Sequence, residues 1–308
     1  MDSLQAFVSQ PLEGSAANPH NEALRGQIQR ALDLICTVLT LFPLEMLALT
    51  FNGGKDACVV LYLVQLALRL RGVAEGEAGG RLKVLYFSPE HGDFPEVISF
   101  MAKISEDHHV TYTTYPAGTS FKDGMRDLVE KKGLKAVFLG VRRGDPHSLE
   151  SEHLEPSSPG WPVFLRVNPL LTWDYGQIWD FLRRFSLPYC RLYDEGYTSL
   201  GDTRTTVRNP ALRRVEGGYR PAYALENWTL ERANRRVADR KEDAVKEDKG
   251  GDADGQADDV RVKRREAAWE GALSSPSLVI GEEEPAGRGR KDEVGETLEE
   301  EEELLQRH

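Results

Sequence analysis

The residues best suited to chemistry lie in one short stretch, Asn52-Gly53-Gly54-Lys55-Asp56. An apolar, β-prone run ends there and an apolar helical pattern begins directly behind it, so the glycines stand where a strand turns into a helix. The first turn of a helix leaves backbone N–H groups unpaired, and glycine lets a phosphate approach the backbone closely. Lys55 would add a mobile positive charge, and Asp56 would bind a metal ion or cap the helix. A tight turn with a capping aspartate and a solvated lysine is the alternative.

A second charged group, containing Arg142 and Asp145, follows a later apolar run. It would supply cations and a carboxylate facing the first turn, or it would be an ordinary surface turn started by Asp-Pro. Arg232 and Arg235 lie one turn apart in a predicted helix, where they would clamp a polyphosphate or form a solvated basic surface. Phosphoryl-type chemistry needs little more than placed positive charge, Mg²⁺ held by oxygens, and aligned reactants. These segments could provide all of that.

Trp161 and Arg166 flank a short predicted strand. A tryptophan in a Gly-Pro-rich loop is a good stacking surface for a flat heterocycle, and a hydrophobic anchor that pins the loop is the alternative. Three histidines have no ligand-like spacing, and we assign them no metal: His91, His108 and His109.

Apolar periodicity predicts strands alternating with helices over the first half of the chain. Helices are predicted over about 21–42, 55–71, 94–107 and 120–132. Strands are predicted over 46–51, 82–87, 109–115 and 135–140, and the first two are apolar enough to be buried. This alternation indicates an α/β fold with a doubly wound, mainly parallel, Rossmann-like sheet, in which ligands bind outside the carboxyl ends of the strands. The 52–56 turn and the 142–145 group both lie at such ends.

The second half of the chain departs from this alternation. Residues 141–162 form a long polar segment, which in a compact domain is either functional or disordered. Ordered structure resumes at 163–171, and further helices are predicted over 173–186 and about 228–240. We therefore divide the chain into a flexible leader at 1–19, a domain at 20–240 with a C-terminal helical and loop extension, and a low-complexity, disordered acidic tail at 241–308.

The composition excludes several broad classes of function. The 308 residues carry a net charge of −11, which argues against a general nucleic-acid or membrane-surface binder. Cys36, Cys58 and Cys190 are isolated, so we expect neither a disulfide framework nor a Cys-x-x-Cys pair, and we infer a reducing compartment. No apolar run approaches the length of a membrane span. We therefore expect a soluble, cytoplasmic protein.

Over roughly residues 20–240, an ordered set of motifs resembles eukaryotic FAD synthase. The motifs are Thr50-Phe51-Asn52-Gly53-Gly54-Lys55-Asp56, Gly140-x-Arg142-x-x-Asp145-Pro146, Gly160-Trp161-Pro162, Arg166-Val167-Asn168-Pro169-Leu170-Leu171, Ile178-Trp179-Asp180-Phe181-Leu182, Tyr197-Thr198-Ser199-Leu200-Gly201, Asn209-Pro210 and Glu231-Arg232-Ala233-x-Arg235. The resemblance implies a nucleotidyltransferase, an FMN adenylyltransferase of the phosphoadenosine-phosphosulfate reductase-like, adenine nucleotide α-hydrolase-like fold. One Gly-Gly-Lys-Asp turn is a weak signal, whereas the ordered set is specific.

The resemblance implies that the terminal phosphate of FMN attacks the α-phosphorus of ATP, with Mg²⁺, giving FAD and pyrophosphate in the last step of FAD biosynthesis. It implies contacts to ATP and its phosphates from Phe51, Asn52, Gly53, Gly54, Lys55, Asp56 and Arg142, and to the flavin from Ser158, Trp161 and Arg166. The implied catalytic residues are Asn52, Asp56, Asp145, Arg232 and Arg235, and the implied Mg²⁺ ligands are Asp56 and Asp145.

Two positions depart from the family pattern. Ser158 stands where relatives often carry a flavin-contacting carboxylate, and Gly144 stands where we expect a hydroxyl. We expect activity to survive both changes. The resemblance also implies a single-domain, fungal-type chain without the upstream molybdopterin-binding-like domain of the animal form. We expect a monomer whose partners are ATP, FMN and client flavoproteins, with no nucleic acid or membrane partner.

Three other functions are weighed against this one. A phosphoadenosine-phosphosulfate reductase uses a catalytic cysteine near its C-terminus, and no cysteine lies beyond Cys190. A thiolating ATP pyrophosphatase would normally need Cys-x-x-Cys pairs. A non-catalytic nucleotide-binding scaffold, whose acidic tail recruits partners, agrees with the predicted tail but leaves the intact 52–56 motif and the arginine pair unexplained.

Overall fold

The computed structural model of the chain describes residues 1–9, 19–73, 82–145 and 148–235. All of them belong to one of the two units into which the chain divides. The tail predicted at 241–308 lies outside the described residues. Within the described part, no helix is both long enough and apolar enough to cross a membrane.

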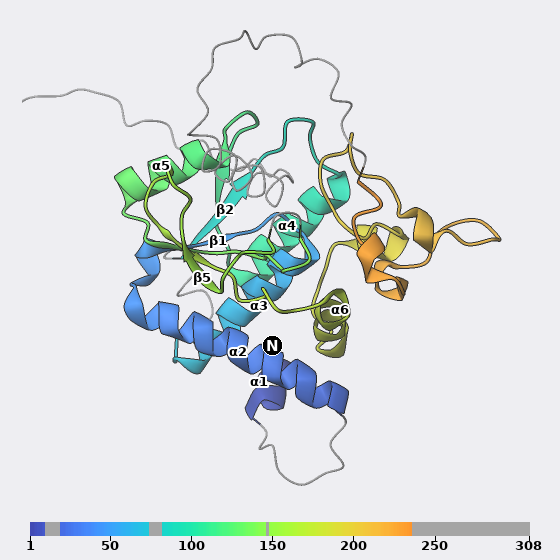
Figure 1. The fold of residues 1–308 in the computed structure, drawn as a ribbon, viewed down its shortest axis with the longest axis horizontal. Coiled ribbons are helices and arrows are strands. Elements are labelled where there is room, and N and C mark those ends of the chain that lie inside the picture. The colour runs from blue at the N-terminus through green and yellow to red at the C-terminus, as the bar shows by residue number, and fades with distance from the viewer. Residues whose placement is uncertain (10–18, 74–81, 146–147, 236–308) are drawn as a thin grey trace, which may run out of the picture. The chain divides into compact units, whose positions relative to one another are not determined.

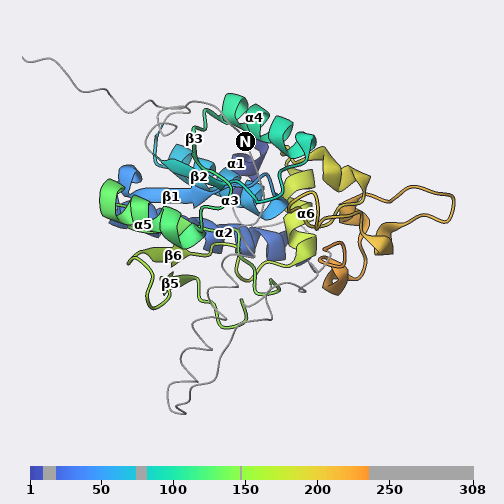
Figure 2. The same cartoon turned by 90° about the horizontal axis from the view of Figure 1, so that it is seen from above.

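The described strands form one sheet in the order β3-β2-β1-β4-β6-β5 (Figures 1 and 2). They are β1 (Leu47–Thr50), β2 (Lys83–Phe87), β3 (Tyr112–Tyr115), β4 (Ala136–Phe138), β5 (Leu154–Pro156) and β6 (Leu165–Val167). Every neighbouring pair is parallel except β5 and β6. The order, in which β1 is flanked by β2 and β4, confirms the predicted doubly wound, mainly parallel α/β sheet.

Strand β5 lies inside the segment 141–162, for which the sequence pattern predicts no regular structure. It forms because its backbone groups find partners on β6, with which it pairs antiparallel at the edge of the sheet. The carbonyl of His153 also accepts a hydrogen bond from the backbone N–H of Asn168, at 2.9 Å. Pairing with a distant strand therefore orders a stretch that has little strand propensity of its own.

The sheet separates two apolar layers, because successive side chains of a strand point to opposite faces. One face packs on α2 (Pro19–Leu41), α3 (Lys55–Leu70) and α4 (Pro95–His108), and the other packs on α5 (Phe121–Lys132) (Figure 1). All residues of α3 from Lys55 to Leu68 are buried except Asp56 and Gln65. A helix that is apolar on nearly every side is a central helix, and its first turn is the one that the glycines precede.

Two helix starts follow from local capping. The Oγ atom of Ser120 accepts a hydrogen bond from the backbone N–H of Asp123 at 3.1 Å and so begins α5. Helix α6 (Tyr175–Arg184) begins with a capping box, in which Asp174 and Gln177 each accept a hydrogen bond from the other's backbone N–H, at 2.7 and 3.0 Å. The helices predicted over 120–132 and 173–186 are therefore confirmed, with their starts set by these caps.

The first residues of the chain do not match the expected loose leader. Asp2–Ser9 forms helix α1, whose Leu4 side chain is fully buried. The ring of Phe7 packs edge-on against Phe185 with ring centroids 5.2 Å apart. The helix is too short to be stable alone, so packing of its apolar side chains on the core provides its order.

The arginine-rich helix predicted over 228–240 is wrong as far as residue 235, where the described chain ends. One short 3₁₀ helix, Trp228–Leu230, is followed by turns. The buried Asn209 side chain donates a hydrogen bond to the carbonyl of Leu230 at 2.8 Å, and Asn234 donates one to the carbonyl of Ser199 at 2.7 Å. The backbone of 228–235 therefore makes i to i−3 bonds in place of the α-helical i to i−4 pattern, and hydrogen bonds from distant side chains hold these turns.

Candidate active site

The turn between β1 and α3 is tight and depends on glycine. Gly53 has φ of 70°, a left-handed conformation that favours glycine. The side-chain oxygen of Asn52 accepts a hydrogen bond from the N–H of Gly54 at 2.9 Å, which closes the turn. The hydroxyl of Tyr193 accepts a hydrogen bond from the N–H of Lys55, also at 2.9 Å. The start of α3 is therefore held from both sides.

Because β1 and β4 are parallel neighbours, the loops that follow them meet at the same edge of the sheet. Arg142, after β4, places its Nε 2.7 Å from Oδ1 of Asp56 in the first turn of α3. A Cβ added at Gly140 would lie 3.1 Å from the backbone of Asp56 and Ala57, so the two loops approach closely there. The structure thus brings together the two charged groups that the sequence places at strand ends.

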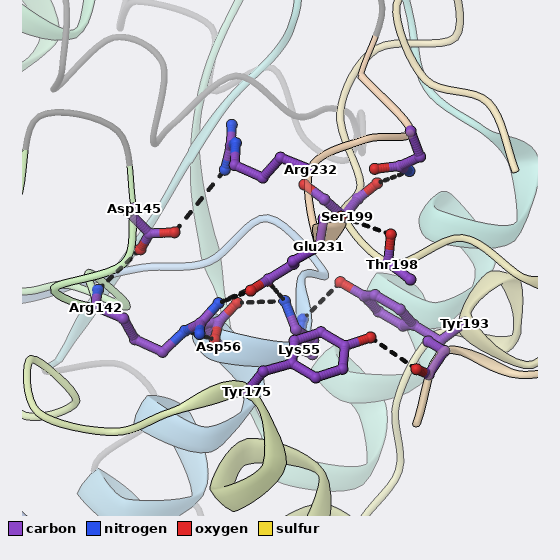
Figure 3. A network of polar contacts seen from close by, with 12 residues as sticks. Lys55, Asp56, Arg142, Asp145, Tyr175, Tyr193, Thr198, Ser199, Glu231 and Arg232 are labelled. Atoms are coloured by element: carbon purple, nitrogen blue, oxygen red, sulfur yellow. Dashed lines mark hydrogen bonds and ion pairs between the residues drawn. The ribbon is translucent and has the colours of Figure 1, made fainter. Parts of the chain in front are cut away.

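Glu231 completes this ion cluster (Figure 3). Its Oε1 lies 2.5 Å from Nζ of Lys55, and its two oxygens lie 2.6 and 2.7 Å from Nη2 of Arg142. Lys55 also pairs with Asp56, at 2.9 Å. The side chains of Lys55 and Arg142 are only 2% and 5% exposed, so these two cations are held by carboxylates rather than by water.

Asp145 and Arg232 extend the cluster on one side (Figure 3). Oδ2 of Asp145 accepts a hydrogen bond from the backbone N–H of Arg142 at 2.8 Å, and Oδ1 lies 3.9 Å from Nη1 of Arg232. The cations Lys55, Arg142 and Arg232 equal in number the carboxylates Asp56, Asp145 and Glu231. The cluster therefore has no net formal charge.

Burial and neighbouring charge act in opposite directions on the two aspartates. Burial alone would raise the pKa of Asp56, but the charges of Arg142 and Lys55 outweigh it and hold that pKa below its usual value. Burial raises the pKa of Asp145, because the Arg142 charge offsets only part of the effect. Asp145 therefore takes up a proton at a higher pH than Asp56 does.

The segment that carries Glu231 is fixed by buried hydrogen bonds to its backbone. Oγ1 of Thr198 donates to the carbonyl of Glu231 at 2.6 Å, and the Asn209 side chain donates both to Oγ1 of Thr198, at 2.7 Å, and to the carbonyl of Leu230. Thr198 and Asn209 are fully buried. Sequence reasoning assigned no role to Glu231, although it stands in the quoted motif that ends with Arg235.

Arg235 lies beside Arg232 but has its own surroundings. Its Nη1 donates a hydrogen bond to Oγ1 of Thr206 at 2.9 Å, and a Cβ added at Gly201 would overlap its guanidinium. Burial and the nearby charge of Arg232 lower the pKa of Arg235 to about 10, so the side chain stays charged at neutral pH. The absence of a side chain at residue 201 makes room for this cation.

The three residues assigned to the flavin lie together near the start of α5. Oγ of Ser158 accepts a hydrogen bond from Nη2 of Arg166 at 2.7 Å, and the Arg166 guanidinium lies 5.9 Å from the ring centroid of Trp161. Trp161 is 6% exposed and its ring packs against Phe121, with centroids 5.8 Å apart. In this structure the ring is therefore a loop anchor, the alternative weighed above, rather than an open stacking surface.

Two further expectations change in the folded chain. The expected mobile charge of Lys55 is wrong, because its Nζ is buried above the rings of Tyr175 and Tyr193, at 5.3 and 5.9 Å from their centroids, and pairs with two carboxylates. Phe51 is 1% exposed, its ring stacks on Tyr112, and its backbone N–H donates a hydrogen bond to the carbonyl of Leu85 at 2.9 Å, so its side chain is not available to a ligand. Both side chains belong to the framework that supports the loop.

Comparison with known proteins identifies relatives of the chain. The phosphoadenosine phosphosulfate reductase domain model matches residues 121–208. A probable FAD synthase of Schizosaccharomyces pombe is 36% identical over 225 residues, which cover 72% of this chain and 83% of the relative. This identity extends across most of both proteins.

Two solved structures have the same fold. The crystal structure of yeast FAD synthetase in complex with FAD gives a TM-score of 0.64 at 22% identity and covers 76% of this chain and 96% of the yeast one. That of Candida glabrata FMN adenylyltransferase in complex with FMN and an ATP analogue gives 0.61 at 22% identity, with the same coverage. Together with the extended identity to the Schizosaccharomyces pombe relative, the fold and the ordered motifs show that the chain belongs to the FAD synthase family.

Proposed function

We propose that this member of the FAD synthase family transfers the AMP group of ATP to the phosphate of FMN, with Mg²⁺. An oxygen of the FMN phosphate forms a bond to the α-phosphorus of ATP, and the bond from that phosphorus to the bridging oxygen of the β-phosphate breaks. The products are FAD and pyrophosphate. The observation that carries this proposal is the meeting of the Asn52-to-Asp56 turn, the Arg142 loop and the Glu231-to-Arg235 segment at one edge of a parallel sheet.

The chain's own part in this reaction is to place charge. The glycine turn at the N-terminal end of α3 suits the triphosphate, because the positive end of the helix dipole lies there, and Arg232 and Arg235 suit the phosphates of the two substrates. Side-chain nucleophiles are not required, because FMN supplies the attacking oxygen. Such a reaction depends on alignment and electrostatic stabilisation, which buried and paired cations provide without reorganisation.

Asp145 is the better of the two proposed Mg²⁺ ligands. In the described residues, no group of three or more His, Cys, Asp or Glu side chains could hold a metal by itself. Mg²⁺ usually takes one or two carboxylates together with substrate phosphates, so a full protein cage is not needed. Among the described contacts, Oδ1 of Asp145 has only a 3.9 Å ion pair, whereas both oxygens of Asp56 lie within 2.9 Å of a cation. Bound with ATP, the metal would neutralise charge on the leaving pyrophosphate.

For the flavin side, we propose that Ser158, Trp161 and Arg166 shape the loop that receives FMN. Their mutual contacts and burial suit support of this loop better than direct stacking. We also propose that residues 20–240 form the catalytic unit of a cytoplasmic monomer. ATP and FMN are its small-molecule partners, and flavoproteins that receive FAD are further ones.

The test is direct. Purified protein incubated with FMN, ATP and MgCl₂ is expected to form FAD and pyrophosphate in equal amounts, measured by chromatography and a coupled pyrophosphate assay, and to form neither with EDTA. Asp145→Ala is expected to raise the Mg²⁺ concentration needed for half-maximal rate, whereas the exposed Asp123→Ala serves as the matched control. A folded protein that binds both substrates and makes no FAD would leave the non-catalytic scaffold as the better explanation.

A further inference from the structure

One carboxylate joins three parts of the site that are far apart in the chain. Glu231 contacts Lys55 at the start of α3 and Arg142 after β4, while its own backbone begins the segment that carries Arg232. We infer that Glu231 is a positioning residue that anchors the segment 231–235 to the phosphate-binding turn and so sets the place of Arg232 opposite Asp145. The inference rests on the proposed function for its kinetic consequence, but the anchoring itself does not depend on it.

The contacts favour a permanent anchor over a counter-ion that substrate phosphate would displace. The Lys55 ammonium is confined between two carboxylates and two aromatic rings, those of Tyr175 and Tyr193, and its side chain is 2% exposed. The backbone of Glu231 is held separately by the buried hydroxyl of Thr198, at 2.6 Å. Displacing the carboxylate would leave Lys55 and Arg142 with Asp56 as their remaining partner in the cluster, which is costly for cations that are only 2% and 5% exposed.

The charge balance of the cluster predicts what happens when Glu231 loses its charge. With Glu231→Gln, the cluster changes from zero to one net positive charge, and the amide provides only one acceptor oxygen for Lys55 and Arg142. Arg232 is the next residue in the chain, so we expect loss of the Glu231 ion pairs to let Arg232 move from its place opposite Asp145, even though Thr198 still holds the Glu231 carbonyl. A displacement of about 1 Å at a group that aligns reactants can lower the rate by about 100-fold.

The kinetic test compares Glu231→Gln with Glu226→Gln, whose side chain is 84% exposed and pairs only with Arg220 in the contacts described. We expect kcat for FAD formation to fall by about 100-fold in Glu231→Gln and to stay unchanged in Glu226→Gln. Arg232→Gln is then introduced into the wild type and into Glu231→Gln. If Glu231 acts through Arg232, the loss caused by Arg232→Gln will be much smaller in the second background. Equal losses in both backgrounds, or a wild-type kcat for Glu231→Gln, would overturn the inference.

A second measurement needs no activity. Hydrogen exchange of the backbone amides in 231–235, on the ligand-free protein, is expected to be faster in Glu231→Gln than in the wild type and Glu226→Gln, while α5 stays protected. Unchanged exchange in 231–235 would refute the anchor even in an active enzyme. If exchange in 231–235 is faster in Glu231→Gln but the wild type makes no FAD, the anchor is supported and the proposed function is rejected. If Glu231→Gln does not fold, Glu231→Asp, which keeps the charge but shortens the side chain, carries the same comparisons.

Discussion

Removal of Arg142 tests the physical account of the ion cluster most directly. Its guanidinium is 5% exposed and pairs with Asp56 at 2.7 Å and with Glu231 at 2.6 Å. Burial would lower the pKa of Arg142, but the two carboxylates outweigh burial and keep the side chain charged. In Arg142→Gln, Lys55 alone would lie between both carboxylates, and the cluster would change from zero to one net negative charge.

The expected loss of stability follows from burial. Breaking a buried ion pair by removing one partner costs about 3 to 5 kcal/mol. The side chains of Asp56 and Glu231 keep 21% and 14% of their surface in solvent, so we expect the lower end, about 3 kcal/mol. In a domain of this size, such a loss lowers the Tm by about 6 to 12 °C. The pKa of Asp56 should also rise, because the largest favourable charge beside it is gone.

The assay is urea unfolding followed by tryptophan fluorescence, with linear extrapolation to water. Arg143→Gln is the matched control, since this neighbour is exposed and its guanidinium bonds only to the Leu149 carbonyl among the contacts described. The double variant Arg142→Gln/Glu231→Gln restores charge balance and should be more stable than the sum of the single losses predicts. Equal free energies of unfolding for Arg142→Gln and Arg143→Gln would contradict this account of the ion cluster. So would a double variant whose loss equals the sum of the losses of Arg142→Gln and Glu231→Gln.

Three further predictions concern the segments around Arg235. Gly201→Ala should push the Arg235 guanidinium aside and weaken binding of FMN or ATP in calorimetric titrations, with little change in Tm; unchanged affinity would contradict this. Arg235→Gln should slow FAD formation without lowering the free energy of unfolding. The fold lowers the pKa of Arg235 to about 10, so the charged form of this side chain lowers the free energy of unfolding below that pH. The free energy of unfolding that Arg235→Gln gains over the wild type should therefore decrease when urea titrations are repeated above pH 10. Asn209→Ala should lower the free energy of unfolding by about 1 to 3 kcal/mol in the same assay, since the buried carbonyl of Leu230 loses its donor; a smaller loss would mean that water replaces it.

Much of the fold could be predicted from local patterns. The apolar runs of β1 and β2 indicate strands buried on both faces, and the Gly-Gly break between β1 and α3 marks where the chain reverses. Capping residues such as Ser120 mark helix starts because they act on the next few residues only. In each case the decisive interaction lies within a few residues of the sequence signal.

The meeting of the two charged loops was also predictable, from the order of the strands in the sheet. Parallel strands align their carboxyl ends, so the turn at Gly53 and the group at Arg142 had to share an edge once β1 and β4 were neighbours. The outcome for α1 and for 228–235 was not predictable in this way. A burial site for Leu4 exists only after α2 and α3 are folded, and the buried amide of Asn209, distant in sequence, holds a chain of turns where the arginine spacing suggests a helix.

The sequence by itself therefore determined the parallel α/β sheet, the glycine turn between β1 and α3, and the family to which the ordered motifs belong. Only the tertiary structure decided which charges pair. Lys55 and Glu231 are separated by 176 positions, and nothing near either residue distinguishes a buried ion pair from two solvated charges. Whether Trp161 is an open ring or an anchor likewise depends on Phe121 packing over it. Charged and aromatic side chains take their roles from burial and neighbours, and both are properties of the folded chain.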